Sequence, residues 1–275
     1  PVCSPYRAAF LTGQYPARLG ILDYLRPNSE NGLSTQHITL PEMLHQNGYA
    51  TGIIGKWHLS GYKYHGAKNE VRPTDHGFAW NTGSEVKSVG NGANFWPYVF
   101  RTQPIRWLDL PQNKLGRGEY LTDRLNHEAI GFIERNRDKP FFLYLPHSMP
   151  HWPQYSSERF AGKSANGKWG DAAEEIDWST GEILKALKAN GLDKKTMVIF
   201  MSDNGGAVRH GASNQPLRGG KGSTWEGGHR VPFIARWPKR IEAGSTSEQT
   251  VCLTDLMATS ATLTGTTIPR EAAED

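Results

Sequence analysis

Cysteine, long apolar runs and runs of like charge are all scarce in this 275-residue chain. Its two cysteines are too few for a disulfide framework. No apolar stretch approaches the roughly 20 residues that cross a bilayer, so no membrane span is expected. The formal net charge of +4 is spread along the chain without a Lys/Arg run, which argues against a nucleic-acid groove. A mildly basic surface suits an anionic substrate better.

The chain also lacks an initiator methionine and a signal peptide. It opens with PVCSP, a run typical of the middle of a loop, so we expect upstream sequence to be missing. A length of 275 residues suits one sizeable α/β domain over 1–275. Its composition is 37% hydrophobic and 21% charged, with a mean hydropathy of -0.58, as in soluble globular proteins.

Apolar runs that favour strands alternate with helical patterns along the chain. Short runs bounded by turn residues predict strands at 49–54, 141–145, 196–201 and 231–236. Apolar periodicity and end signals predict helices at 8–15, 41–48, 120–135, 171–189 and 253–263. This order predicts an α/β fold with a largely parallel sheet and helices on both faces.

The stretch 61–111 is rich in glycine, asparagine and aromatic residues and has no clear period. It predicts a long excursion from the fold. Its aromatic side chains could stack against a sugar ring in a substrate cleft, or the stretch could be a purely structural insertion. The aromatic residues in question are Trp80, Phe95, Trp96 and Tyr98.

Polar clusters follow three of the predicted strands. Ligands of open parallel sheets bind beyond the carboxyl ends of the strands, so a functional site is expected at that edge. The clusters are Lys56 with His58, His147 with His151, and Asp203 with Asn204.

The two cysteines call for different interpretations. Cys252 lies in the apolar run TVCL and is expected to be a buried thiol. Cys3 precedes a helix, whose dipole and free N–H groups favour a thiolate and bind anions, and Arg7 lies one turn further on. Cys3 is therefore either a nucleophile in an electropositive pocket or a small residue packed under a loop.

The segment CSPYRAAFLTG at 3–13 resembles the signature of the sulfatase family, C-x-P-x-R followed by a Leu-Thr-Gly turn. Tyr6 stands where the family most often has Ser or Ala. Four more segments are similar to family motifs, in family order. They are GKWH at 55–58, PHWP at 150–153, SDNG at 202–205 and GKGSTWEGG at 220–228. Each match alone fits a surface lysine, a packing histidine or an ordinary turn, and the joint pattern is what is specific.

The resemblance implies an alkaline-phosphatase-like sulfatase core that hydrolyses sulfate esters. In that family a formylglycine-generating enzyme oxidises the motif cysteine, here Cys3, and a hydroxyl of the hydrated aldehyde is the nucleophile. The family's metal turn corresponds to Asp203 and Asn204, whose hard oxygens suit Ca²⁺, with Mg²⁺ as the alternative. The remaining implied site residues are Arg7, Lys56, His58, His151 and Lys221.

The chemistry of a sulfate ester accounts for these residue types. Lys56 and Lys221 supply compact positive charge for the sulfate, and Arg7 helps to hold the nucleophile. We expect His151, together with Lys221, to protonate the leaving alcohol, and His58 to act as the base that releases sulfate. His147 is expected to be structural.

The resemblance also implies parts that this sequence does not contain. Family members carry a metal-binding Asp pair on a first strand upstream of the cysteine motif, and a smaller antiparallel subdomain after the last helix predicted here. The 275 residues alone are therefore expected to bind metal weakly and to turn over sulfate esters poorly or not at all.

Other functions remain open. A phosphate or phosphonate ester hydrolase of the same superfamily would use the same groups, and a non-catalytic relative would only bind sulfated glycans. A thiol enzyme using Cys3 directly would need a base that Lys56 or His58 supplies only loosely. The family implies a sulfated small molecule or carbohydrate as substrate, and a secreted, periplasmic or lysosomal location.

Overall fold

The computed structural model describes residues 2–62, 66–82, 99–103, 106–109, 119–268 and 272. Its main sheet has five strands in the order β4-β3-β2-β1-β5. β1 lies between β2 and β5 and is parallel to both, whereas β3 pairs antiparallel with β2 and with β4. The strands are β1 (Ala50–Ile54), β2 (Trp80–Thr82), β3 (Val99–Gln103), β4 (Arg106–Asp109) and β5 (Phe141–Tyr144).

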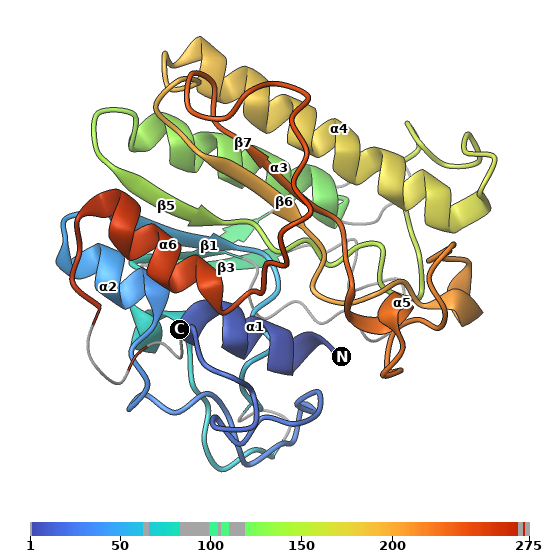
Figure 1. Cartoon of the computed structure of the whole chain (residues 1–275), viewed down its shortest axis with the longest axis horizontal. Coiled ribbons are helices and arrows are strands. Elements are labelled where there is room, and N and C mark those ends of the chain that lie inside the picture. Colours follow the sequence, from blue (N-terminus) through green and yellow to red (C-terminus); the bar gives the residue numbers. More distant parts are fainter. Residues whose placement is uncertain are drawn as a thin grey trace.

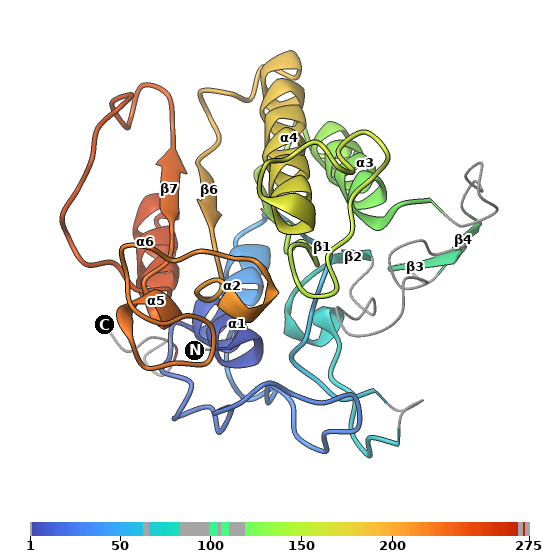
Figure 2. The same cartoon turned by 90° about the vertical axis from the view of Figure 1, so that its right-hand side faces the viewer.

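A second sheet consists of β6 (Val198–Met201) and β7 (Phe233–Arg236), which pair antiparallel. Within the described ranges, β5 hydrogen-bonds only to β1 and β6 only to β7. Helices cover the sheets from two sides, as Figures 1 and 2 show. They are α1 (Cys3–Thr12), α2 (Leu40–Gln46), α3 (Leu121–Arg135), α4 (Gly167–Ala189), α5 (Glu226–His229) and α6 (Asp255–Thr264), with short 3-10 turns η2 (Pro73–His76) and η4 (Val208–His210).

Side chains of the central strands point alternately to the two faces of the main sheet, which explains why helices cover both faces. Ile53 points into a core with α1, α2 and α6, whereas its neighbour Ile54 points into a core with α3 and α4. On β5, Phe142 and Tyr144 join the first core, and Phe141 and Leu143 join the second. Successive side chains of a strand face opposite ways, so a fully apolar strand must be buried on both sides. The α/β fold with parallel strands at its centre and helices on both faces is confirmed.

The glycine at position 52 lets the second layer approach the sheet closely. A Cβ on Gly52 would lie 2.5 Å from the Phe132 ring of α3. Helix α2 begins where the sequence signals predict, because Thr39 and Glu42 form a reciprocal capping box and Pro41 occupies the first turn.

Several boundaries differ from the sequence expectations. Helix α1 begins at Cys3 rather than at residue 8, because Pro5 sits in the first turn, where no backbone N–H is needed. Helix α4 begins four residues before the predicted start at 171. Cys252 is exposed, so the prediction of a buried thiol is wrong. The apolar run there is an irregular segment, and Leu253 rather than Cys252 turns inward.

The excursion at 61–111 also proves partly regular. It contributes η2 and the strands β2, β3 and β4, so part of it extends the main sheet. Trp80 packs under the Arg135 guanidinium, 4.6 Å from the ring centroid, which is a packing role. The other aromatic residues proposed there as sugar-stacking groups, Phe95, Trp96 and Tyr98, lie outside the described residues.

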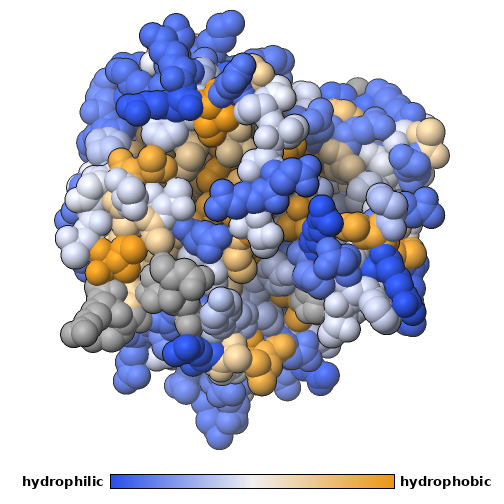
Figure 3. Space-filling view, viewed as in Figure 1, coloured by the Kyte–Doolittle hydropathy of each residue, from blue (hydrophilic) through white to orange (hydrophobic). Residues whose placement is uncertain are grey.

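The surface in Figure 3 is largely hydrophilic, and apolar side chains gather over β6 and β7. The cross-strand neighbours Phe200 and Ile234 both belong to the exposed apolar residues there. Over the ranges that the structure describes, no helix is long and apolar enough to cross a membrane.

Candidate active site

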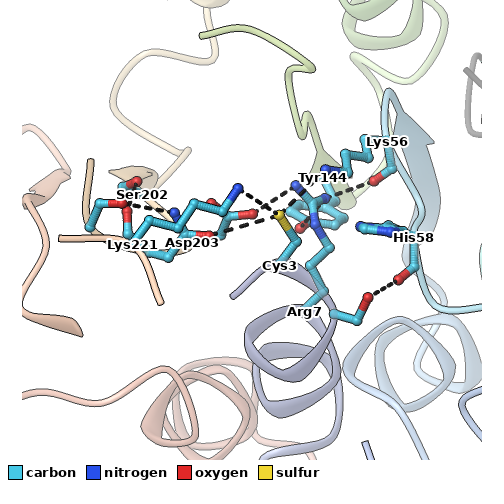
Figure 4. A network of polar contacts seen from close by, with 11 residues as sticks. Cys3, Arg7, Lys56, His58, Tyr144, Ser202, Asp203 and Lys221 are labelled. Carbon is cyan, nitrogen blue, oxygen red and sulfur yellow. Dashed lines mark hydrogen bonds and ion pairs between the residues drawn. The ribbon is translucent and has the colours of Figure 1, made fainter. Parts of the chain in front are cut away.

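Cys3 is the first residue of α1 and lies among side chains from three distant segments (Figure 4). Its Sγ is 3.4 Å from Lys56 Nζ, 3.8 Å from Lys221 Nζ and 3.8 Å from Asn204 Oδ1. The side chain is only 4% exposed. The positive end of the helix dipole and two ammonium groups therefore meet at this sulfur, which marks the place where an anion is stabilised.

Arg7 lies one turn along α1 and ties the site together. Its guanidinium donates to the backbone oxygen of Lys56 (2.8 Å), to Asp203 Oδ2 (3.1 Å) and to the Tyr144 hydroxyl (3.3 Å). Burial opposes the charge on Arg7, but Tyr144 and Asp203 outweigh burial and raise its pKa. Arg7 thus stays charged and joins α1 to the ends of β1, β5 and β6.

Lys56 reaches the site through a tight turn at the carboxyl end of β1. Gly55 adopts a φ of 126°, and a Cβ there would collide with the Pro146 carbonyl, so a side chain is not tolerated. The Lys56 N–H donates to the same carbonyl at 2.9 Å. Burial lowers the pKa of Lys56, and the charges of Arg7 and Lys221 lower it further against the opposing effects of Cys3 and Asp203.

His58 follows in the same turn and is held in a left-handed conformation with a φ of 57°. The Ser4 hydroxyl donates to its backbone oxygen at 2.8 Å, and its Nε2–H donates to the Leu25 carbonyl at 2.9 Å. Burial, followed by the charges of Lys56 and Arg7, lowers the pKa of His58 to about 2. The ring is therefore neutral, and its buried Nδ1, which has no hydrogen-bond partner among the described residues, carries a free lone pair.

Asp203 and Asn204 follow β6 and place oxygen atoms beside Cys3. The Ser202 hydroxyl closes this turn by donating to the Asn204 backbone oxygen at 2.8 Å. Burial disfavours the charge of Asp203, but Arg7, Lys56 and Lys221 lower its pKa overall, so it is a carboxylate.

These two side chains fit a hard divalent cation in donor chemistry, because such ions take carboxylate and amide oxygens. They supply two of the roughly six to eight oxygens that Ca²⁺ takes. No group of three or more His, Cys, Asp or Glu side chains within the described part of the chain is placed to hold a metal ion.

Lys221 and His151 come from two further loops. The Lys221 N–H donates to the Gly206 carbonyl at 3.1 Å, which docks the glycine-rich loop on the segment after Asn204. The His151 Nδ1–H donates to the Trp152 carbonyl at 2.7 Å, which leaves Nε2 as an acceptor. Burial, then the charges of Lys56 and Lys221, lower the pKa of His151 to about 4.

The structure brings the residues predicted from the sequence to one place. Cys3, Arg7, Lys56, Asn204, Asp203 and Lys221 form one network of direct contacts. His58 and His151 lie close enough to this network that the charge of Lys56 lowers the pKa of both. Burial alone lowers the pKa of His147 to about 4, and its buried Nδ1 has no hydrogen-bond partner among the described residues.

Sequence reasoning missed two residues of this network, Tyr144 and Ser4. Tyr144 ends β5 and contacts Arg7, but an aromatic residue in an apolar strand predicts only packing. Ser4 Oγ also accepts from the Leu25 N–H at 2.9 Å and so connects that segment to His58. Its place inside the cysteine motif was the only available signal.

Comparison with known proteins gives a consistent result. The chain matches the Sulfatase family model over residues 1–266. It is 34% identical over 345 residues to the steryl-sulfatase of Mus musculus, an alignment that covers 98% of this chain and 55% of that protein. It is 37% identical over 301 residues to the N-acetylgalactosamine-6-sulfatase of Homo sapiens, covering 100% of this chain and 55% of that protein.

Among solved structures, the crystal structure of Ps i-CgsB in complex with k-i-k-neocarrahexaose matches with a TM-score of 0.84 at 31% identity. That match covers 99% of this chain and 63% of the other. The chain therefore spans about half the length of the curated relatives that it matches.

Proposed function

The chain belongs to the sulfatase family and has its alkaline-phosphatase-like fold, and from this premise we propose that it hydrolyses sulfate esters. The observation that carries the proposal is the convergence on Cys3 of Lys56, Lys221 and the amino end of α1. Sulfate esters are anionic, and further negative charge develops on the leaving oxygen as the ester bond breaks. Fixed positive groups in a buried site stabilise that charge without reorganising.

The nucleophile in this proposal derives from Cys3. Formylglycine, made from Cys3 by a formylglycine-generating enzyme, supplies a hydroxyl when its aldehyde is hydrated. The Cys3 sulfur marks the position from which that oxygen would project, between the two lysines. Arg7 fixes this end of α1 through its bonds to Lys56, Asp203 and Tyr144.

Asp203 and Asn204 would hold Ca²⁺ or Mg²⁺ beside the same position. A hard cation there contributes positive charge toward the sulfate oxygens. Arg7 keeps Asp203 ionised and aimed at the site.

In this proposal, the side chains around Cys3 carry out the proton transfers. His58 is neutral, and the lone pair on its buried Nδ1 makes it the proton acceptor. His151 is neutral too, and its Nδ1–H donates a hydrogen bond to the Trp152 carbonyl, so its Nε2 accepts rather than donates. This state favours the Lys221 ammonium as the proton donor to the leaving oxygen. This differs from the sequence expectation that His151 helps to protonate the leaving alcohol.

We propose the class of substrate from the names of the relatives. An N-acetylgalactosamine-6-sulfatase and a structure in complex with k-i-k-neocarrahexaose both favour a sulfated carbohydrate, with another small sulfated molecule as the alternative. Placement in a secreted, periplasmic or lysosomal compartment is proposed on family membership alone.

The test uses the natural full-length protein, expressed together with a formylglycine-generating enzyme. Mass spectrometry of the peptide containing residue 3 should show formylglycine, and 4-nitrophenyl sulfate should be hydrolysed faster than 4-nitrophenyl phosphate. Cys3→Ala should abolish turnover, and Lys221→Met should lower kcat by about 10²–10³-fold, the usual effect of removing one charge-stabilising donor. Unchanged turnover in Cys3→Ala, or faster cleavage of the phosphate, would overturn the proposal.

A further inference from the structure

An exposed aromatic surface lies directly beside the candidate active site. Trp152 follows His151 in the chain and is 54% exposed. Its indole stacks on the His210 imidazole with ring centroids 5.1 Å apart and planes inclined by 25°. His210 covers one face of the indole, so the exposed part of Trp152 is its other face and its edges, and Trp152 is the chain neighbour of a residue of the site.

The two segments that carry these rings are tied together. Gln154 Nε2 donates to the Pro150 carbonyl at 3.3 Å and to the His210 carbonyl at 3.1 Å. The Gln154 amide therefore connects the 150–154 loop to η4. This connection holds Trp152 and His210 in place, so the stacked arrangement exists before any ligand binds.

The same surface extends to the loop of Lys221. Val208 is exposed and lies in η4, two residues before His210. A Cβ on Gly220 would lie 3.0 Å from Val208 Cγ2, so η4 packs against the residue just before Lys221. We call the two rings, Trp152 and His210, together with the adjoining Val208, the aromatic rim. It spans from the loop of His151 to the loop of Lys221.

We propose that the aromatic rim binds a pyranose ring of a glycan whose sulfate ester lies at Cys3. The inference rests on the proposed function and names a substrate-binding surface for it. Pyranose rings present flat C–H faces with hydroxyls at their edges, and an open aromatic face with polar neighbours suits both features. An all-apolar ligand such as a sterol instead favours an enclosed apolar pocket, because an open rim leaves most of it in water.

Charge on the Lys221 loop supports a polyanionic glycan. The Arg218 guanidinium lies 3.7 Å from the Trp225 ring centroid on this loop, and Trp225 is itself exposed. A cation stacked on an indole adds positive charge and a further ring to the loop that carries Lys221, which favours additional sulfate or carboxylate groups on the glycan.

The experiment measures binding apart from turnover. In the full-length protein carrying Cys3→Ala, affinities are measured calorimetrically for tetrasaccharides of chondroitin sulfate and of carrageenan, and for dehydroepiandrosterone sulfate. Adding Trp152→Ala should weaken the best-bound tetrasaccharide about tenfold, the upper end of one aromatic stacking contact. Trp152→Phe, which keeps a ring, should recover most of that affinity.

Trp178→Ala is the matched control. Trp178 is an indole on α4 that also carries a guanidinium, Arg159 at 3.8 Å, and its other ring contact is Phe160 rather than a residue of the rim. Its removal should leave glycan affinity unchanged, and thermal unfolding should show that every variant is folded.

Three results would overturn the proposal. The first is absence of binding to every tetrasaccharide, and the second is equal glycan affinity with and without the Trp152 ring. The third is an equal loss of affinity for the steroid sulfate on Trp152→Ala, which would indicate a surface that binds any flat apolar ring. Failure of the proposed function is separate, because it would appear as absent sulfate ester hydrolysis in the unmutated protein whatever the binding results.

Discussion

The ion pair between Arg7 and Asp203 should stabilise the fold as well as the site. The two atoms are 3.1 Å apart, and the side chains are 6% and 31% exposed. Coulomb's law gives about 5 kcal/mol at this distance with an effective dielectric constant of about 20, which is an upper bound because both groups lose hydration. Hydrogen bonds to charged groups contribute about 1.5–3 kcal/mol, and the partial exposure of Asp203 favours the middle of that range. We therefore expect a coupling energy of about 2 kcal/mol.

A double-mutant cycle measures this coupling. Arg7→Met keeps an unbranched chain without the charge, and Asp203→Asn keeps the shape of the carboxylate. Arg7→Met should lower the free energy of unfolding by about 3 kcal/mol, since it removes the cation paired with Asp203 and also the donor to the Lys56 carbonyl. Urea unfolding of the four proteins in the presence of a chelator isolates the pair from any bound cation.

The pair of Lys185 and Glu182 on α4 is the control for this cycle. Its atoms are closer, at 2.7 Å, but the side chains are 76% and 28% exposed. An exposed pair three residues apart on a helix contributes only about 0.2–0.5 kcal/mol. If the cycle of Arg7 with Asp203 gave a coupling as small as this control, the argument from burial would be wrong.

Two further predictions concern stability. The pKa of His58 is about 2 in the folded protein and about 6.5 when unfolded, so below pH 6.5 the unfolded chain binds a proton that the folded one does not, and stability falls as the pH is lowered. When the pH is lowered from 7 to 5, the free energy of unfolding measured in urea should therefore fall by about 2 kcal/mol less in His58→Gln than in the parent. Parallel plots of unfolding free energy against pH for the two proteins would contradict this. Gly52→Ala should lower the free energy of unfolding by about 1–3 kcal/mol, because the new Cβ meets Phe132 at 2.5 Å. Gly181→Ala in α4, where a Cβ meets nothing within 4 Å, should raise it by about 1 kcal/mol, and thermal denaturation that ranked the two the other way would refute the packing argument.

Much of the architecture was predictable because its signals are local. Apolar periodicity and end signals predicted most of α3, α4 and α6 and the second half of α1, and α2 carries its capping box and proline within a few residues. The central strand β1 is almost fully buried and β5 packs its side chains against both cores, and strands placed between two helical layers are largely apolar in sequence. The polar residues after the strands marked the carboxyl edge as the site, and the motif resemblance selected which of them to consider.

Other features could not be predicted because they depend on contacts between distant segments. Tyr144 and Ser4 became parts of the site only when folding brought Arg7 and His58 to them. β6 and β7 pair antiparallel with each other, and strand pairing is decided by neighbours that local patterns do not specify.

The sequence by itself determined which side chains are present and, through their periodicity and motifs, that they would gather at one edge of an α/β sheet. The tertiary structure decided their electrostatic state. Cys3 and Lys221 are 218 positions apart, and Arg7 and Asp203 are 196 apart, yet each pair is in contact. Whether His58 is neutral or Asp203 ionised depends on burial and on charges a few ångströms away, and those distances exist only in the folded chain.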